Sequence, residues 1–581
     1  MKALLALLPY LKKYRARLLL GLVFVTIANA ASSLIPKVVG TAIDALGTPG
    51  FTTTTVFYYS LGVLGLTLIS GFSMYMTRQT IIVTSRLVEY DLKNSLVQAI
   101  ERQTALFFSN NSTGSLMALS TNDIASVREF LGPAIMYSAN TVASFLFVLT
   151  LMIMVSPELT LYTILPLPII AASTYLVGQK VHKMYKIVQE QYSNLTTTAQ
   201  ESFSGAKVVR AYSRSKYEVE TFANESKKYV RQRLRLAMWQ SSTMPLMIIL
   251  IGFAQIITLW YGGSLVIEGR ATLGDLTQFF IYIAQLIWPI AAIGWVTNLI
   301  QRGAASMARL SKIFDHPVDI QSPENPIKEV PKGAIEFKNV SLQYSETMPK
   351  VLNGINLKIP AGSSLGIVGS VGSGKSSLIS LIPRLYDVTE GEVFIDSNPL
   401  KQYDVDILRK AIGVVQQEPF LFSSTIAENI GMGTLQEYTE YDVQKASEQA
   451  QLHNDVLRFP IQYDTILGER GITLSGGQRQ RTAIARALMR NPKILILDDS
   501  LSAVDTQTEE QILSMLEVVK KERTTIIISH RISAVKLADK VIVLDRGRIV
   551  EEGSHEELIE LGGMYKSIYT QQLLEEELQT F

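Results

Sequence analysis

A short glycine-rich segment in the second half of the chain has residue types and a spacing suited to phosphate binding. Residues 369–376 read Gly-Ser-Val-Gly-Ser-Gly-Lys-Ser, with an apolar run before them and an apolar helical pattern after them. Glycines let backbone N–H groups surround phosphate oxygens, Lys375 can reach the β- and γ-phosphates, and the Ser376 hydroxyl can ligate Mg²⁺. Since both flanks fit, we favour a Mg²⁺–ATP site over a chance match in a glycine-rich loop. The predicted nucleotide contacts here are Gly369, Ser370, Val371, Gly372, Ser373, Gly374, Lys375, Ser376 and Ser377.

A carboxylate at the end of another apolar run could complete this site. The sequence Ile-Leu-Ile-Leu at 494–497 predicts a buried strand, and Asp498 follows it directly. A carboxylate in that place can hold Mg²⁺ beside the phosphates. Many buried strands end in Asp, so this signal is weak by itself. The chain contains no Cys, which excludes disulfides, thiolate catalysis and zinc–thiolate sites.

The composition indicates several domains, at least one of them in a membrane. The chain has 581 residues, more than one ordinary domain holds. Hydrophobic residues make up 47 % and charged residues only 18 %, whereas soluble proteins are about a quarter charged. The 54 basic and 52 acidic side chains leave a formal charge of +2. Because no strong field would attract nucleic acid, we expect no such partner.

The apolar residues are concentrated in the first half of the chain. About six uncharged stretches approach or exceed the roughly 20 residues that a helix needs to cross a bilayer. This repetition makes buried helices of a soluble protein a poor alternative. The predicted spans lie within residues 18–36, 51–77, 132–157, 159–179, 239–267 and 276–301.

The basic residues predict the orientation of these spans. The connection 180–238 carries twelve Lys and Arg residues, whereas the turn at Glu158 carries none. Since Lys and Arg are enriched on the cytoplasmic side, we expect the two long connections, 78–131 and 180–238, and both chain termini to be cytoplasmic. Alternation of charged and apolar residues in both connections predicts helices that continue out of the membrane.

A change in composition marks the boundary of a second domain. Residues 315–332 contain four prolines among charged residues, which is typical of a linker. We therefore predict a membrane domain at 1–314, a linker at 315–332 and a cytoplasmic α/β domain at 333–581. Strand-like runs at 364–368, 494–497, 524–528 and 541–544 alternate with helical patterns, which predicts a largely parallel sheet.

A further motif makes a family resemblance specific. Residues 474–478 read Leu-Ser-Gly-Gly-Gln and open a predicted helix. With this motif, the chain resembles a half-size ATP-binding cassette (ABC) exporter of the multidrug type over its whole length. The resemblance implies that Tyr344 stacks on adenine, that Gln417 contributes to the metal site and to coupling, and that His530 is the switch histidine. Segments 468–471 and 502–505 resemble two further conserved segments of such exporters, the latter being the D-loop.

The resemblance also implies a dimer, because exporters of this family hold ATP between two subunits. The phosphate loop of one subunit faces the 474–478 motif of the other, where Ser475 and neighbouring amides offer donors to a γ-phosphate. Two coupling helices are implied within 107–127 and 201–217. The motif residues expected to contact nucleotide are Ser475, Gly476, Gly477 and Gln478.

One residue departs from the family pattern. After the metal-binding Asp498 the family usually has Glu, which polarises the attacking water, but here the position is Asp499. Asp is one methylene shorter, and a displacement of about 1 Å can lower a rate about a hundredfold. The chain therefore resembles the degenerate-site subunit of heterodimeric exporters. A homodimer that hydrolyses with Asp499, and an ATP-gated channel or regulatory membrane protein, are the alternatives.

The resemblance assigns roles to the site residues but leaves the substrate open. The catalytic set is Asp499, His530 and Gln417, and the Mg²⁺ set is Ser376, Gln417 and Asp498. The spans carry aromatic and modestly polar residues without buried charge, which suits small amphipathic or hydrophobic compounds: drug-like molecules, lipids and hydrophobic peptides all remain open. Helix packing and interfacial aromatic belts explain many of these residues equally well. We expect a multi-pass protein of a bacterial inner membrane.

Overall fold

The computed structural model describes residues 2–48, 52–345, 347–468, 471, 473–500, 508–514 and 523–580. The chain forms two compact units. The first comprises Met1–Glu101 and Thr113–His316, and the second comprises Arg102–Ser112 together with Pro317–Phe581. We call the second unit the cassette.

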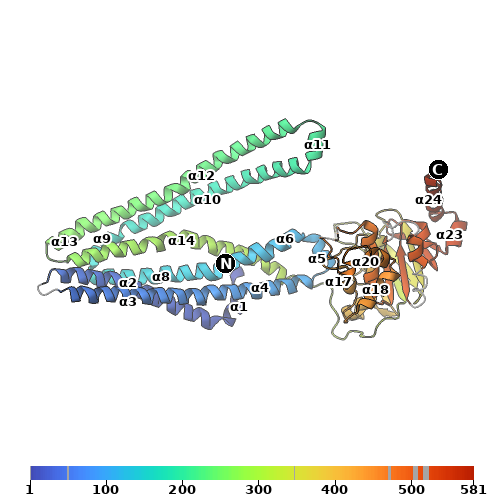
Figure 1. The fold of residues 1–581 in the computed structure, drawn as a ribbon, viewed down its shortest axis with the longest axis horizontal. Helices are drawn as coiled ribbons and strands as arrows, with labels where there is room; N and C mark the ends of the chain where they lie inside the picture. Colours follow the sequence, from blue (N-terminus) through green and yellow to red (C-terminus); the bar gives the residue numbers. More distant parts are fainter. Residues whose placement is uncertain are drawn as a thin grey trace. The chain divides into compact units, whose positions relative to one another are not determined.

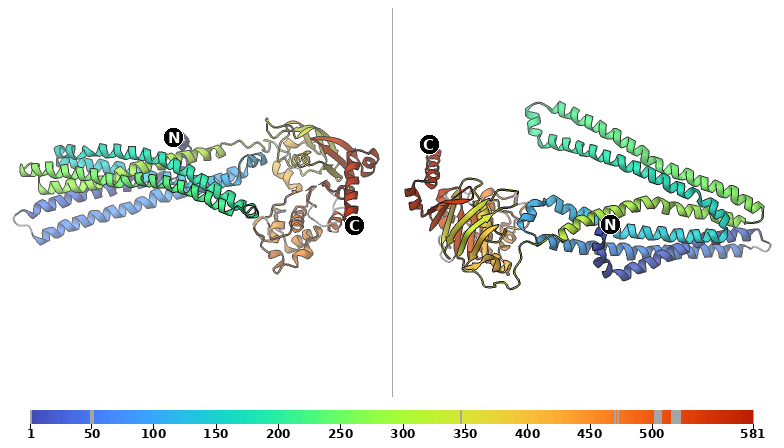
Figure 2. Two further views of the ribbon diagram at one scale, coloured as in Figure 1. Left: turned by 90° about the horizontal axis from the view of Figure 1, so that it is seen from above. Right: turned by 180° about the vertical axis from the view of Figure 1, so that it is seen from behind.

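The first unit consists of helices, most of them long (Figure 1). Helices α10 and α12 form a hairpin that α11 closes, and the hairpin diverges from α14 toward α11 (Figures 1 and 2). The long helices are α2 (Arg15–Leu46), α3 (Thr53–Thr77), α4 (Val83–Glu101), α8 (Ile135–Val155), α10 (Pro166–Ser204), α12 (Ser215–Ile257) and α14 (Leu273–Phe314). The short helices are α1 (Leu8–Lys13), α6 (Thr113–Ala118), α7 (Ile124–Glu129), α9 (Pro157–Ile164), α11 (Ala206–Ala211) and α13 (Gly263–Ile267).

Five helical segments among the described residues are long and apolar enough to cross a membrane. They overlap the predicted spans 18–36, 51–77, 132–157, 239–267 and 276–301, with segments that begin at Thr53 in the second case and end at Val155 in the third. The remaining predicted span, 159–179, is helical but divided, because α9 ends at Ile164 and α10 begins at Pro166. The uncharged part of α10 then ends before Lys180. Five spans therefore satisfy the criteria of length and apolarity, where the sequence predicts six.

Two helices of the first unit approach each other closely at one end. The Asp44 carboxylate, near the end of α2, accepts hydrogen bonds from the Thr272 hydroxyl at 2.7 Å and from the Gly274 N–H at 2.8 Å. A Cβ atom at Gly274 would lie 2.2 Å from the Gly40 carbonyl oxygen. A side chain larger than hydrogen would therefore separate the end of α2 from the beginning of α14.

The cassette contains two sheets. Four strands form a sheet in the order β2-β1-β4-β5, with antiparallel neighbours. Six strands form the other, in the order β10-β9-β3-β8-β7-β6, with all neighbours parallel except β9 and β10. The strands of the first are β1 (Ile335–Leu342), β2 (Leu352–Ile359), β4 (Glu390–Ile395) and β5 (Asn398–Pro399). Those of the second are β3 (Ser364–Gly369), β6 (Ile412–Val415), β7 (Ile494–Asp498), β8 (Thr524–Ile528), β9 (Lys540–Asp545) and β10 (Arg548–Gly553).

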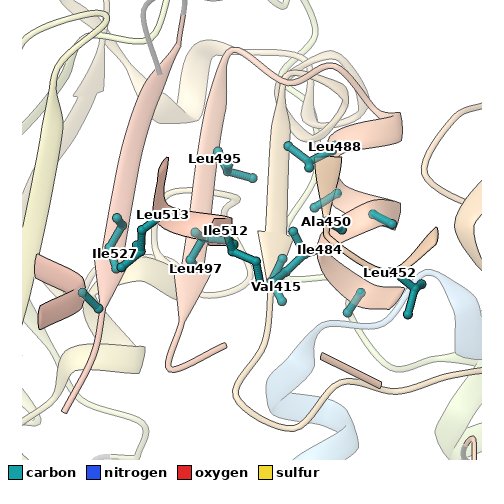
Figure 3. Packing of buried hydrophobic residues seen from close by; sticks show 14 of the residues in the cluster. Val415, Ala450, Leu452, Ile484, Leu488, Leu495, Leu497, Ile512, Leu513 and Ile527 are labelled. Carbon is teal, nitrogen blue, oxygen red and sulfur yellow. The ribbon is translucent and has the colours of Figure 1, made fainter. Parts of the chain in front are cut away.

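The six-stranded sheet confirms the predicted parallel arrangement. Strands β3, β7 and β8 are buried along nearly their whole length, as expected for a parallel sheet covered on both faces. Leu495 and Leu497 of β7 pack in one cluster with Ile484 and Leu488 of α20 (Figure 3). The helices of this unit are α5 (Ala105–Asn110), α15 (Lys375–Ser380), α16 (Val405–Lys410), α17 (Ile426–Gly431), α18 (Glu440–Gln449), α19 (His453–Val456), α20 (Gly476–Met489), α22 (Ile532–Val535), α23 (His555–Leu561) and α24 (Met564–Thr580).

A shielded ion pair fixes α20 against the segment that follows α18. Arg481 of α20 donates to the Gln451 carbonyl oxygen and to the Asp455 carboxylate, each at 2.5 Å, and its side chain is only 13 % exposed. The change Arg481→Met leaves Asp455 without this partner, so we expect a loss of about 2 kcal/mol in unfolding free energy. Thermal unfolding of the purified full-length chain in detergent measures the effect as a lowered Tm.

A matched control removes a second basic residue that lies near Asp455. Arg458 lies 3.9 Å from Asp455, but its side chain is 81 % exposed. Because exposed ion pairs contribute little, Arg458→Met should leave Tm within about 1 °C of the unmodified chain. Equal shifts in the two variants would contradict the special role of Arg481.

Candidate functional site

The predicted phosphate loop connects β3 to α15. Gly372 and Gly374 have φ angles of 79° and 100°, in the left-handed region that favours glycine. A Cβ atom at Gly374 would also lie 2.9 Å from the Val351 carbonyl oxygen. The Lys375 side chain is buried and its amine donates to the carbonyl oxygens of Gly369 and Ser370 at 2.9 and 2.8 Å. These bonds hold the amine against the backbone at the beginning of its own loop.

A turn after β9 supports this loop from behind. The Ser370 hydroxyl donates to the Asp545 carboxylate at 3.2 Å, and the Gly547 N–H donates to the Ser373 carbonyl oxygen at 3.0 Å. The sequence analysis did not identify Asp545 or Gly547 as supports of the site. The local signal was a polar turn, Asp-Arg-Gly, after the apolar run of β9.

Two adjacent carboxylates stand at the end of β7. The Asp498 side chain is buried and hydrogen-bonded to Ser376, and this burial raises the pKa of Asp498 above its ordinary value. Burial lowers the pKa of the Lys375 amine, while Asp498 and Asp499 act in the opposite direction. The Asp498 carboxylate and the Lys375 amine are therefore both partly desolvated at the phosphate loop. Their interactions with a charged ligand bound there are stronger than they would be in water.

The second carboxylate is held in an unusual backbone conformation. Asp499 has a φ angle of 44°, in the left-handed region, where Asp and Asn are enriched among residues other than glycine. Its N–H donates to the Ile528 carbonyl oxygen at 2.9 Å. The Gln417 amide, two residues after β6, donates to the Asp499 carboxylate at 3.4 Å. The structure thus links two residues that the sequence analysis placed in the catalytic set.

One pocket of about 290 Å³ brings most of the predicted residues together. It joins the phosphate loop to the ends of three strands, because β6, β7 and β8 are neighbours in the sheet. Val351 and Ile528 also line it and were missed by the sequence analysis, since apolar residues carry no local signal of such a role. The predicted residues in its lining are Val371, Gly372, Ser373, Gly374, Lys375, Ser376, Ser377, Gln417, Asp498, Asp499 and His530.

Tyr344 lies beside this pocket rather than in its lining. Its hydroxyl is 2.8 Å from the Ser377 hydroxyl, and its ring meets Tyr386 edge to face at 5.0 Å. The phenol is therefore fixed next to the first turn of α15. Gly369 and Ser370, at the other end of the phosphate loop, also lie outside the lining of the pocket.

His530 is positioned by a residue that no local pattern predicts. The Gln572 side chain of α24 accepts a hydrogen bond from the Ile532 N–H at 2.8 Å and donates to the His530 carbonyl oxygen at 2.5 Å. One side-chain amide thus bonds to the backbone of both residues that flank Arg531. The guanidinium of Arg531 pairs with the buried Glu509. Both contacts fix the segment that carries the pocket-lining His530.

The predicted 474–478 motif lies outside the pocket lining. Ser475 is the N-cap of α20: its hydroxyl accepts from the Gln478 N–H at 3.2 Å, and the Gln478 side chain accepts from the Ser475 N–H at 3.0 Å. Gly476 and Gly477 form the first turn of this helix. Of the two further motif segments, Glu469, Arg470 and 502–505 lie outside the described residues.

The donors in the pocket suit a hard cation. Mg²⁺ prefers oxygen ligands and usually keeps several waters beside one or two protein groups and substrate phosphates. The Ser376 hydroxyl, the Asp498 carboxylate and the Gln417 amide all line the pocket, and the first two are already in contact. The described residues contain no cluster of three or more His, Cys, Asp or Glu side chains arranged for a metal. A metal held here would therefore depend on the nucleotide for part of its ligand set.

The chain is similar to known proteins over nearly its full length. The family model described as the ABC transporter transmembrane region matches residues 18–290, and the model described as ABC transporter matches residues 352–502. Over 561 residues the chain is 36 % identical to the uncharacterized ABC transporter ATP-binding protein YknU of Bacillus subtilis, which covers 96 % of each chain. It is 34 % identical to the ATP-dependent lipid A-core flippase of Syntrophus aciditrophicus over 584 residues, covering 98 % of this chain and 95 % of that protein.

A solved structure is similar in fold. It is described as a bacterial Atm1-family ABC exporter with ATP bound, and it is 26 % identical in sequence with a TM-score of 0.81. The similarity covers 96 % of this chain and 99 % of that chain.

Proposed function

The chain belongs to the ABC transporter family, and from this premise we propose that it is one subunit of an exporter for small amphipathic or hydrophobic compounds, drug-like molecules or lipids. It is a multi-pass membrane protein, and its cassette is an ATPase domain that binds ATP and couples its hydrolysis to transport. The observation that carries the proposal is the pocket that gathers Lys375, Asp498 and Gln417 around the phosphate loop. Relatives named as a lipid A-core flippase and as the multidrug resistance-like protein MdlA of Escherichia coli support the substrate class.

The proposed chemistry assigns each residue of this pocket a task. The phosphate loop and Lys375 bind the phosphates, and Tyr344 holds the adenine. Ser376, Asp498 and Gln417 would hold Mg²⁺, which supplies electrostatic stabilisation of the phosphates when bound. Asp499 is proposed to orient the attacking water, and His530 to contact the γ-phosphate. The proposed domain limits are 1–314 for the membrane domain, 315–332 for the linker and 333–581 for the cassette.

The proposed complex contains two cassettes, and we favour a heterodimer. Ser475 is exposed and lies outside the pocket formed by this chain's own phosphate loop, as expected if it serves a site on another subunit. Asp499 in place of Glu supports a slow site at this chain's loop. The α10–α12 hairpin exposes large apolar side chains, among them Phe203 and Val219, which a second subunit could cover.

The membrane arrangement is part of the proposal. We propose six spans, with α9 and the beginning of α10 together forming the fourth, and cytoplasmic termini in a bacterial inner membrane. The basic connection 180–238 and the bacterial sources of the relatives support this arrangement. A divided fourth span is acceptable in a bilayer where neighbouring helices satisfy the freed backbone groups.

A homodimer is the second candidate, because a specific contact favours it. The Gln417 amide donates to the Asp499 carboxylate, and both line the pocket. In this alternative Asp499 itself serves as the base, and two identical chains form two equivalent sites.

The subunit composition of the native complex tests the choice. The chain is tagged at one end, extracted from its own membrane in mild detergent, and analysed by mass spectrometry of the intact complex. We expect two different polypeptides in equal amounts. A single polypeptide at dimer mass would overturn the heterodimer and leave the homodimer.

A further inference from the structure

A cavity of about 240 Å³ lies among α2, α3, α8 and α14 in the first unit. Its lining combines apolar side chains with amides and hydroxyls, and it includes no Asp, Glu, Lys, Arg or His. Polar groups at the depth of membrane-spanning helices are costly and commonly mark a ligand pathway. The hydrogen-bond partners of these polar groups therefore decide which groups are available to a ligand.

Two asparagines connect α2 and α8 at this cavity. The Asn29 side-chain N–H₂ donates to the Val25 carbonyl oxygen at 2.8 Å and to the Asn140 side-chain oxygen at 3.0 Å. These bonds use the donor of Asn29 and the acceptor of Asn140. Within the described part of the chain, no protein group occupies the side-chain oxygen of Asn29 or the N–H₂ of Asn140. The cavity thus presents one acceptor and one donor side by side.

Two prolines add backbone groups to the same place. Pro36 lies inside α2 and cannot donate to the Ser32 carbonyl oxygen, four residues earlier. The Gln285 amide of α14 donates to that oxygen instead, at 3.2 Å. Pro289 likewise leaves the backbone carbonyl of Gln285 without its helical donor. The amide oxygen of Gln285 also has no partner among the described residues, so Gln285 brings two acceptors to one wall.

The remaining wall is apolar and accessible. Met74, Met136 and Trp288 line the cavity, and the side chains of Met74 and Trp288 are more than half exposed. An apolar surface next to unpaired amide groups suits a molecule with a hydrocarbon part and a small polar head. A charged head would lose its hydration here without finding a counter-ion, which is costly.

We propose that this cavity selects neutral amphipathic molecules whose polar head carries both a hydrogen-bond donor and an acceptor, as a carboxamide does, and rejects their carboxylate analogues. The proposal rests on the export function proposed above and specifies its substrate class. Asn140 donates to the head group and Asn29 accepts from it, while Gln285 offers further acceptors. A bound carboxamide would thus pair the free amide groups of Asn140, Asn29 and Gln285.

Two lipid-like probes with the same tail test this selectivity. N-Dodecanoyl-leucinamide and N-dodecanoyl-leucine differ only in a terminal carboxamide against a carboxylate. Equilibrium binding is measured at pH 7.5 on the purified native complex in lipid nanodiscs, and ATP-driven uptake on the same complex in vesicles. We expect at least tenfold tighter binding of the carboxamide. Equal affinity for both probes, or tighter binding of the carboxylate, would overturn the proposal.

Variants locate the binding to this cavity. Asn140→Leu should weaken carboxamide binding about tenfold, which is the loss of one well-placed hydrogen bond of about 1.4 kcal/mol. Thr150→Val is the matched control on α8, because Thr150 is exposed and, among the described residues, its hydroxyl bonds only to the Leu146 carbonyl oxygen of the same helix. If Asn140→Leu does not assemble, Ser144→Val narrows the cavity from the same helix and should weaken binding similarly. Unchanged affinity in the assembled variant would overturn the assignment.

The two proposals fail in different ways. If the unmodified complex shows no ATP-driven uptake of any amphipathic probe, the export function itself is wrong. If uptake occurs but both probes bind equally, or the cavity variants bind as the control does, export stands and the assignment of this cavity is wrong.

Discussion

Replacing Asp499 by Glu is expected to raise ATP turnover at the phosphate loop of this chain by about tenfold to a hundredfold. The added methylene moves the carboxylate about 1 Å toward the position that the usual Glu would occupy, and a misplacement of that size can cost about a hundredfold. The side chain lines the pocket and has the Gln417 amide at 3.4 Å, so a longer acid remains within reach of the same donor.

The backbone at this position opposes the change to a limited extent. Asp499 has a φ angle of 44°, which Asp adopts more readily than Glu does. We expect Asp499→Glu to lower the stability of the cassette by about 1 kcal/mol. Turnover is therefore compared at a temperature well below the Tm of both proteins. Asp499→Asn is the matched variant: it should leave turnover of a heterodimer nearly unchanged, while a homodimer would lose it.

The second large effect is expected from Ser475→Arg, which should reduce ATP turnover and transport of the complex by a hundredfold or more. Ser475 is exposed at the N-terminus of α20 and its hydroxyl already satisfies one backbone donor. In the proposed heterodimer, this motif faces the competent site on the other subunit. A long cationic side chain fills that space and removes the cap, which is itself worth about 1 kcal/mol.

Lys375→Ala is the informative counterpart. Lys375 belongs to this chain's own phosphate loop, so in the heterodimer the substitution abolishes ATP binding at the slow site and should reduce overall turnover only severalfold. Steady-state ATPase activity and uptake by the reconstituted complex measure both variants. Equal, near-complete losses would indicate equivalent sites and contradict the heterodimer. Combining Ser475→Arg with Asp499→Glu isolates the site at this chain's loop and should restore part of the activity.

Much of the cassette could be predicted because its signals are local. Strand β7 contains four consecutive apolar residues and β8 ends in three isoleucines, and the phosphate loop is specified by glycines whose positive φ angles exclude most other residues. The ends of parallel neighbours meet at one edge of the sheet, which is why Gln417, Asp498 and the loop share a pocket.

The remaining features depend on contacts between distant segments. Gln572 follows His530 by 42 residues, and nothing around it in the sequence indicates that its amide holds that backbone. Asp499 combines its left-handed conformation with a hydrogen bond to Ile528 at the end of β8, a residue 29 positions away in the sequence. The division of the predicted fourth span has a local signal in the sequence, because Pro166 and Pro168 lack the backbone N–H and are expected to kink a helix; the structure adds that the break lies at Leu165.

The close contact between α2 and α14 bears on how these two helices can move. Asp44 holds the beginning of α14 at one end, and the Gln285 amide holds Ser32 farther along, so the two helices are joined at two points. Because the helices are bonded at two separate points, we expect α2 and α14 to move together. The segments that join the α10–α12 hairpin to its neighbours interrupt the helices at the extended residue Ser156 and before Pro166 on one side, and within 268–272 on the other. Gly274 allows the contact between α2 and α14, so we expect a larger residue there to loosen the pairing of α2 with α14 and to let the two helices move separately.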